Sequence, residues 1–526
     1  MRTLTALTLA AVASGCQTAP PGSADPEAPT LAVLLVVDQL GADLMDRYES
    51  LYEGGLRRLL DQGYVFENAT HDHAITETAP GHMTLATGVY PSRHGVVSNT
   101  WFVRDGRNWR SVYSVEDPNR AIVGYPDLPG RSPDNGLSNG LADWIVARDP
   151  AARVVSVSRK DRAAIGLAAQ AVGEVYWLAA EGGEFITSDF YHEAYPNWVT
   201  AFNETEMPRV YAQTVWEDEV PPGLRTLSRP DTSRFELDGE HSFFPHRASD
   251  LVDVDAPGAL NQWRYEYTPF PDQAVVAFAK AATAELELGQ RGTVDYLGVS
   301  LSQTDLVGHS FGPGSREQLD NLLRLDRLLG DLFRFLDDTV GSGRWVLAFS
   351  SDHGVLDIPE QLVDDGIESG RLTRADRDRL IEALQTAGGG APVGQSTAKA
   401  ALLTLPFVEA AYTFDEIEQG PPADSFAVLF ARSHSRGRVA GLESRFGVYA
   451  RYAPRTLEWG SLRATHGSPY YYDRHVPLIF LGGVVPSGAS SERVATVDAA
   501  PTLARLAGVP SPADLDGRVL ESVLDP

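Results

Sequence analysis

The sequence is poor in cysteine and in positive charge. Its 526 residues contain one cysteine, Cys16, so an intramolecular disulfide and a metal site built on thiolates are both excluded. Lys and Arg number 44 against 71 Asp and Glu, which gives a formal net charge of −27. A phosphate backbone requires a basic surface, so this balance argues against a nucleic-acid partner. The sequence also lacks an internal repeat and a zipper pattern, and we therefore expect a monomer.

An apolar run long enough to stay in a membrane is missing from the N-terminus. MRTLTALTLAAVASGC has one Arg, a short apolar stretch and small residues before Cys16, which is typical of an export signal. It resembles a bacterial lipoprotein signal, although Ala13 stands where Leu is usual. We assign residues 1–16 to this signal and 17–30 to a flexible Pro-rich tether. The expected location is the periplasm, with acylated Cys16 anchoring the protein to the outer membrane; ordinary signal cleavage is the alternative.

Continuous apolar runs predict strands that are buried on both faces. They lie at 31–38, 153–158, 294–301, 345–352 and 476–482. Helical patterns separate several of them, and the clearest begins at Ser315, which has capping-box spacing with Gln318. Strands alternating with helices predict an α/β fold with a mostly parallel central sheet and helices on both faces.

Two regions interrupt this alternation. Residues of about 180–265 are rich in Trp, Tyr, Pro and acids, and residues of about 360–460 mix a charged helical segment with Gly-rich pieces. We interpret both as insertions in one catalytic domain, 31–526, and the second as a cap.

Acidic and imidazole side chains follow the predicted strands or lie in adjacent loops. They are Asp38, Asp305, His309, Asp352, His353 and His466. Ligands of open parallel sheets bind beyond the carboxyl ends of the strands, and this donor set suits zinc or a related divalent ion. Each residue alone also has a structural interpretation, as a turn, a cap or a satisfied histidine. Three buried carboxylates together, however, would be costly without cations. We expect His82 and His475 to lie outside the ligand set.

Thr78 opens a predicted helix in TETAPGHMTLATG. As an N-cap it would have a purely structural role. A free hydroxyl at a helix N-terminus is instead well placed beside an anion such as a phosphoryl group, and a metal could activate it as a nucleophile.

Seven motifs occur in an order that resembles the alkaline phosphatase superfamily. They are VVDQL, TETAPGH with LATG, VSNTWF, SRKDR, TDLVGH, SSDHG and THGS. The sequence is most similar to single-chain bacterial zinc alkaline phosphatases with a threonine nucleophile, which are close to the type I phosphodiesterase/nucleotide pyrophosphatase family. The resemblance runs from about residue 31 to the end and implies an alkaline-phosphatase-like fold with inserted cap regions.

The resemblance also implies two zinc ions. One would be held by Asp305, His309 and His466. The other would be held by Asp38, Asp352 and His353, with Thr78 completing it as an alkoxide. Thr78 would then attack phosphorus and form a covalent phosphothreonine, while the other ion steadies the leaving oxygen.

Three further residues bear on which ester is cleaved. Asn99 matches the family asparagine that binds a phosphoryl oxygen, and Lys160 and Arg162 match a Lys-x-Arg pair of the monoesterase branch. Extra cations favour a monoester dianion over a diester. We therefore expect a broad-specificity phosphomonoesterase that releases phosphate from small phosphate esters. The alternatives are a phosphodiesterase or nucleotide pyrophosphatase with the same metal pair, and a catalytically silent lipoprotein that binds phosphate or metal.

Overall fold

The computed structural model describes residues 28–524 except 107, 389–392, 458–459 and 461. The predicted signal peptide, Cys16 and most of the tether lie outside these residues. Within the described ranges, none of the helices combines the length and apolarity needed to cross a membrane.

A nine-stranded sheet forms the centre of the part of the chain that the structure describes, in the order β19-β2-β18-β13-β1-β12-β7-β8-β9. The strands are β1 Leu31–Val37, β2 Tyr64–Thr70, β7 Val154–Ser158, β8 Glu174–Leu178, β9 Phe185–Ile186, β12 Asp295–Leu301, β13 Trp345–Ser350, β18 His475–Gly482 and β19 Gly488–Ala495. All five strands predicted from apolar runs are present. Of the eight strand pairings described in this sheet, five are parallel and three antiparallel, which confirms a mostly parallel α/β sheet.

The direction of β18 differs from the simple alternation that the sequence suggested. This strand runs antiparallel to both neighbours, β13 and β2. Its first residues therefore lie at the edge where β13 ends, since Ser350 pairs with Leu478. A loop that enters β18 can thus reach the same edge as a loop that leaves β13.

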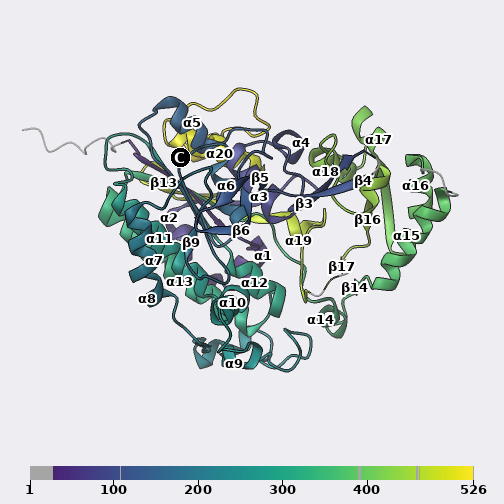
Figure 1. Ribbon diagram of the computed structural model, residues 1–526, viewed down its shortest axis with the longest axis horizontal. Coiled ribbons are helices and arrows are strands. Elements are labelled where there is room, and N and C mark those ends of the chain that lie inside the picture. Colours follow the sequence, from purple (N-terminus) through teal and green to yellow (C-terminus); the bar gives the residue numbers. More distant parts are fainter. Residues whose placement is uncertain (1–27, 107, 389–392, 458–459, 461, 525–526) are drawn as a thin grey trace, which may run out of the picture.

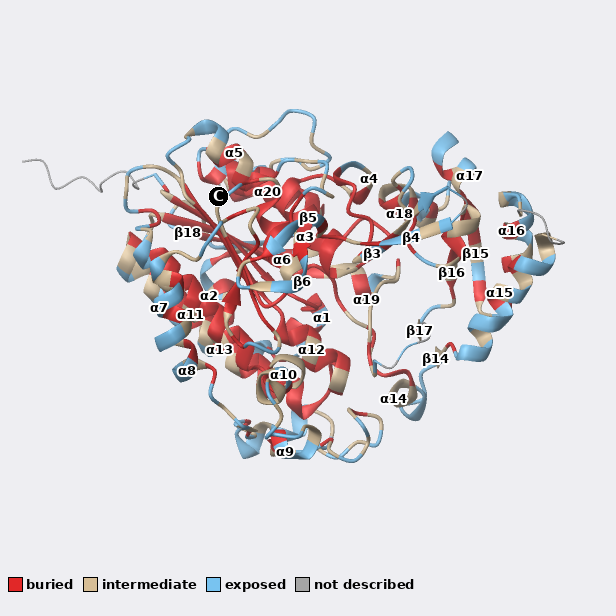
Figure 2. Cartoon of the chain, in the orientation of Figure 1, coloured by how far each residue is buried: buried red, intermediate tan, exposed pale blue. Residues whose placement is uncertain are grey.

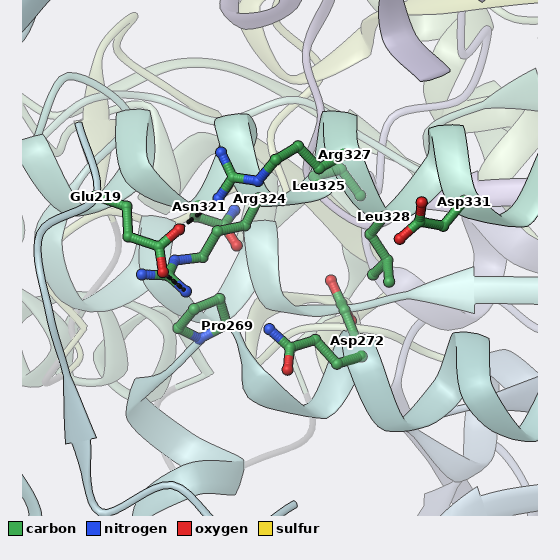
Figure 3. Close-up of a pocket in the computed structure, with 10 residues that line it drawn as sticks. Glu219, Pro269, Asp272, Asn321, Arg324, Leu325, Arg327, Leu328 and Asp331 are labelled. Atoms are coloured by element: carbon green, nitrogen blue, oxygen red, sulfur yellow. Dashed lines mark hydrogen bonds and ion pairs between the residues drawn. The ribbon is translucent and has the colours of Figure 1, made fainter. Parts of the chain in front are cut away.

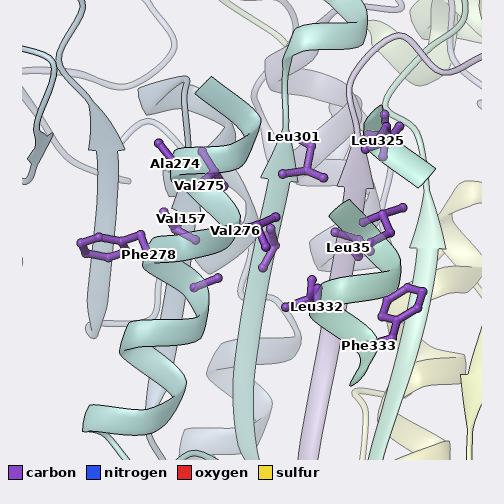
Figure 4. Packing of buried hydrophobic residues seen from close by; sticks show 14 of the residues in the cluster. Leu35, Val157, Ala274, Val275, Val276, Phe278, Leu301, Leu325, Leu332 and Phe333 are labelled. Carbon is purple, nitrogen blue, oxygen red and sulfur yellow. The ribbon is translucent and has the colours of Figure 1, made fainter. Parts of the chain in front are cut away.

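Strand β1 is buried on both faces, and the middle of the molecule is coloured red for buried residues in Figure 2. Its residues Leu31, Val33, Leu35 and Val37 pack into one hydrophobic cluster, and Ala32, Leu34 and Val36 pack into another. Helices α2 (Gly55–Gln62), α11 (Phe270–Glu285) and α13 (Arg316–Leu336) cover the first face. Figure 4 shows this packing, with Val276 on α11, Leu332 on α13 and Leu35 on β1 among the residues of the cluster. Helices α3 (Thr78–Thr87), α5 (Leu141–Arg148), α6 (Asp161–Ala168) and α20 (Ala499–Leu506) cover the second.

Helix α13 begins after Ser315, as predicted. The Ser315 side chain accepts a hydrogen bond from the Gln318 amide (3.0 Å). The reciprocal half of the expected capping box is missing, because the Ser315 amide donates to the Gly312 carbonyl (3.3 Å) and Gln318 Oε1 accepts from Asn321 Nδ2 (2.9 Å). Gln318 Nε2 donates to the Thr304 carbonyl (2.8 Å). Gln318 thus ties α13 to α12 (Gln303–Phe311).

The two predicted insertions are built differently. Segment 180–265 forms short elements such as α7 (Asn197–Thr205) and α10 (Ala259–Tyr267), whose residues Phe202 and Trp263 join the first hydrophobic cluster. Residues 359–457, here called the cap, project to the right of the sheet in Figure 1. The cap contains α15 (Arg374–Gly388), α16 (Gln395–Leu402), β15 (Val408–Thr413), α18 (Ser425–Ser433) and β16 (Val448–Tyr452), and it has a hydrophobic cluster of its own. The exact insertion boundaries stay predictions.

Candidate active site

The predicted site residues meet at one edge of the sheet. Asp38 follows β1, Asp305 and His309 lie on α12 after β12, and Asp352 and His353 follow β13. His466 comes from the loop before β18, which reaches this edge because β18 is antiparallel. These residues form two donor sets in which the potential ligand atoms lie within 4.8 Å of one another.

The first set, Asp38, Asp352 and His353, is fully buried. Asp38 Oδ1, Asp352 Oδ2 and His353 Nε2 have no hydrogen-bond partner, although His353 Nε2 lies 3.5 Å from Asp38 Oδ1 and 3.4 Å from Asp352 Oδ2, and His82 Nδ1 lies 3.2 Å from Asp352 Oδ2. Burial raises the pKa of Asp38 well above its usual value, and repulsion by Asp352 adds to this. Burial also lowers the pKa of His353, so its imidazole is neutral and able to coordinate a metal.

The second set is centred on Asp305. Its Oδ1 lies 3.0 Å from His309 Nε2 and 3.5 Å from His466 Nε2. Although burial acts in the opposite direction, the neighbouring His309 and Lys160 hold the pKa of Asp305 well below its usual value. The carboxylate is therefore ionised.

All three histidines are oriented in the same way. Their Nδ1 atoms contact backbone carbonyls: His309 that of Ala464 (2.8 Å), His353 that of Gly354 (3.0 Å) and His466 that of Thr76 (2.7 Å). A carbonyl accepts a proton from Nδ1, so Nε2 is the ring atom that faces the carboxylates. Although burial acts in the opposite direction, the Asp305 carboxylate raises the pKa of His466 to about 9, so a cation would have to displace the proton on its Nε2. Metal-ligating histidines are commonly fixed in this manner. Together with the unpartnered oxygens of the first set, this arrangement fits two divalent cations.

Lys160 connects the two sets. Its Nζ lies 2.5 Å from Asp38 Oδ2 and 2.6 Å from Asp305 Oδ2, and the residue is only 3% exposed. Lys160 is therefore a buried residue of the site and not part of an exposed turn. Lys160 precedes α6, so the short β7–α6 connection delivers it to the site.

Thr78 is the first residue of α3, and its side chain is not the helix cap. The nearby Asn99 takes that role, because its Oδ1 accepts a hydrogen bond from the Ala79 amide (2.8 Å). Thr78 Oγ1 instead accepts from Arg162 Nη2 (3.4 Å). Asn99 and Arg162 thus flank a hydroxyl at a helix N-terminus, where backbone N–H groups favour an anion.

Close packing holds this helix against the first donor set. A Cβ on Gly81 would lie 2.4 Å from the Asp352 carbonyl oxygen, so glycine is required for the approach. His82 follows with its Nδ1 3.2 Å from Asp352 Oδ2 and its Nε2 2.7 Å from Ser300 Oγ. His82 lies beside the donor set as a support, and His475 lies apart, against Asp43.

Two supporting residues were not identified from the sequence. Gln39 donates from its backbone to Asp352 Oδ1 (3.1 Å) and from Nε2 to Asp305 Oδ1 (2.6 Å), so it bridges both sets. Asp272 of α11 accepts from the amides of Ser302 and Gln303 (2.9 and 3.3 Å), which fixes the start of the helix that carries Asp305. Gln39 lies within the motif VVDQL, next to Asp38, so the motif could have indicated it. Asp272 lies in none of the seven motifs.

Asp272 also lines a cavity of about 380 Å³ between α11 and α13 (Figure 3). Across this cavity Glu219 pairs with Arg324 (3.0 Å) and Arg327 (2.5 Å). The residues described in its lining include none of the two donor sets. The acidic Glu219 and the two arginines of this cavity pair with one another. We therefore place the catalytic site at the edge of the sheet and not in this cavity.

The type I phosphodiesterase/nucleotide pyrophosphatase family matches this chain over residues 32–418. The chain belongs to this family. Among its relatives, alkaline phosphatase PhoV of Synechococcus elongatus is 31% identical, covering 94% of this chain and 93% of the relative. A Myroides odoratus protein named calcium-transporting ATPase is 30% identical, covering 95% of both chains. The crystal structure of alkaline phosphatase PafA, a protein of Elizabethkingia meningoseptica, superposes with a TM-score of 0.84 at 28% identity, over 95% of this chain and all of that one. The family fold predicted from the seven motifs is thus confirmed.

Proposed function

We propose that this family member is a zinc-dependent phosphate monoesterase, an alkaline phosphatase of broad specificity that acts through a covalent phosphothreonine at Thr78. One observation carries the proposal: two cations meet at the site. Lys160 contacts Asp38 and Asp305, one residue from each donor set, and Arg162 contacts the Thr78 hydroxyl. The names of PhoV and PafA support the same activity. A phosphodiesterase using the same site is the alternative.

The metal is proposed to be zinc, with two ions per chain. Asp38, Asp352 and His353 would hold one, and the Asp305 set would hold the other. Neutral imidazole with carboxylate suits zinc. When bound, such ions would neutralise charge on the attacking and leaving oxygens of an in-line displacement.

The protein's own groups orient the ester. The Arg162 guanidinium contacts the Thr78 hydroxyl at the start of α3, and it offers hydrogen bonds to the phosphoryl oxygens. The Asn99 Oδ1 is occupied by the Ala79 amide, so its NH₂ group is the part that faces a bound anion. Thr78 then displaces the alcohol from phosphorus, and water hydrolyses the phosphothreonine to release phosphate.

The monoester preference can be tested directly. Wild-type protein should show a higher kcat/KM for an aryl phosphate than for its methyl diester. Lys160→Ala should lower kcat/KM for the monoester about 100-fold but for the diester less than about tenfold, because a second ester group removes one negative charge. Lys399→Ala, which removes a cap lysine paired with Glu416, is the matched control and should change neither. A wild-type preference for the diester would instead establish the phosphodiesterase alternative.

We further propose that the protein is exported to the periplasm and anchored to the outer membrane through Cys16, acting there as a single chain on small phosphate esters. The support is the N-terminal sequence. Expressed with its native N-terminus, wild-type protein should fractionate with membranes and incorporate labelled fatty acid. Cys16→Ser should abolish both, because serine has no thiol to acylate. Unlabelled, membrane-free wild-type protein would favour ordinary signal cleavage.

A further inference from the structure

A cavity of about 310 Å³ lies between the cap and the catalytic core. Its lining includes Glu77 and His466 from the core and a group of tyrosines, namely Tyr449, Tyr452, Tyr470 and Tyr472. Glu77 directly precedes Thr78, and His466 belongs to the Asp305 donor set. The cavity, here called the tyrosine cavity, therefore opens beside the reaction site.

The position of the tyrosine cavity suits the departing alcohol. In an in-line displacement the alcohol leaves on the side of phosphorus opposite the attacking oxygen. The described lining of the cavity includes His466 of the Asp305 set but neither Thr78 nor the Asp38 set. It thus borders the half of the site that does not carry the nucleophile.

The walls of the cavity present aromatic rings. Tyr470 and Tyr472 stack with their ring centroids 5.7 Å apart. Their hydroxyls are occupied: that of Tyr470 donates to the Tyr452 carbonyl (2.6 Å), and that of Tyr472 accepts from the Arg455 amide (3.3 Å). Aromatic faces and edges favour a flat aromatic guest through stacking.

The charge of the cavity opposes anions. Its described lining contains the acids Glu77, Glu443 and Asp473, and the base Arg371. Arg371 is paired with Glu360 (3.0 Å), so its charge is already compensated. Burial raises the pKa of Glu443 to about 7, so above this pH an alcohol that carries its own negative charge would meet an ionised carboxylate that no described Lys or Arg pairs with.

From these features we infer that the tyrosine cavity is the leaving-group subsite and selects phosphate monoesters of uncharged aromatic alcohols. This inference rests on the proposed monoesterase function and adds the class of substrate. It also assigns the cap a role, because Tyr449, Tyr452 and Glu443 come from the cap and meet the core residues across the cavity.

The consecutive residues Tyr470, Tyr471 and Tyr472 provide a matched test. Tyr472 lines the cavity, whereas Tyr471 is 49% exposed and stacks on His475 outside it. Tyr472→Leu should lower kcat/KM about tenfold for naphthyl phosphate but less than about threefold for propyl phosphate, and Tyr471→Leu should change both less than about twofold. Comparing each variant with wild type cancels the intrinsic reactivity of the two esters. Calorimetric titration of naphthyl phosphate into Thr78→Ala protein, with and without Tyr472→Leu, should show the same loss in affinity without turnover.

The charge is tested with naphthyl phosphate and a carboxynaphthyl phosphate. Burial raises the pKa of Glu443 to about 7, so assays at about pH 9 keep this carboxylate ionised. Wild-type protein should show a kcat/KM about tenfold lower for the carboxylated ester than for naphthyl phosphate. Glu443→Gln should reduce this ratio about fivefold. Glu382→Gln, at an exposed position of α15, should leave the ratio unchanged.

The outcomes separate the inference from the proposed function. Equal losses for naphthyl and propyl phosphate in Tyr472→Leu, or no wild-type discrimination against the carboxylated ester, would overturn the inference while monoester turnover stands. Failure of wild-type protein to hydrolyse any of these monoesters would overturn the proposed function, and the inference with it.

Discussion

Thr78→Ala should lower kcat for aryl phosphates by about 10⁴-fold while leaving the protein folded. The loss should be this large because the variant removes the hydroxyl that we propose attacks phosphorus, at the place where Arg162 contacts it. The fold should persist because Asn99, and not Thr78, caps the Ala79 amide. Single-turnover and steady-state kinetics measure the loss, and circular dichroism should show a change in the free energy of unfolding of at most about 1 kcal/mol.

Two variants of the same helix are the controls. Thr78→Ser keeps a hydroxyl and should retain substantial turnover. Thr87→Ala removes a buried hydroxyl that donates to the Met83 carbonyl at the far end of α3, and it should leave kcat nearly unchanged. Near wild-type turnover by Thr78→Ala would reject Thr78 as the nucleophile.

Removal of the metal should abolish turnover and lower the thermal stability without unfolding the chain. Cations bound at 100 to 1,000 times their dissociation constants stabilise a protein by about 2.7 to 4.1 kcal/mol per site. Chelation removes this stabilisation, and the buried carboxylates then face one another without the cations between them. The chain should stay folded because the Lys160 ammonium contacts Asp38 and Asp305 and compensates part of their charge.

Metal removal is checked by calorimetry and elemental analysis before and after dialysis against a chelator. Added Zn²⁺ should restore both activity and melting temperature. The double variant Asp38→Asn/Asp305→Asn, which disables both donor sets, should show no shift in melting temperature on chelation. Full turnover by metal-free protein would contradict the two-cation site.

The sequence was sufficient to predict the strands in which every residue is buried. β1, β12 and β13 are apolar along their length, and the acids that follow them can be found because parallel strands end at a common edge. His466 was predicted from its loop before the strand at 476–482, and the resemblance implies the same role. Its arrival at this edge depends on the antiparallel direction of β18, which no local pattern encodes. The local sequence likewise could not show that Lys160 bridges Asp38 and Asp305, which lie 122 and 145 positions away from it in the chain.

Features formed by distant segments were beyond prediction for the same reason. Thr78 could be interpreted as a cap until Asn99 was seen to take that role from another loop. Gln39 bridges Asp305 and Asp352, which lie 266 and 313 positions away. The tyrosine cavity combines cap and core residues that have no common motif.

Acid quenching during turnover of an aryl phosphate tests the central claim most directly. Digestion and mass spectrometry should find one phosphoryl group on the peptide that contains Thr78, and none in Thr78→Ala protein treated in the same way. Active protein that turns over the ester but gives no phosphopeptide under conditions where product release is slow, or that carries the phosphoryl group on another residue, would contradict the account.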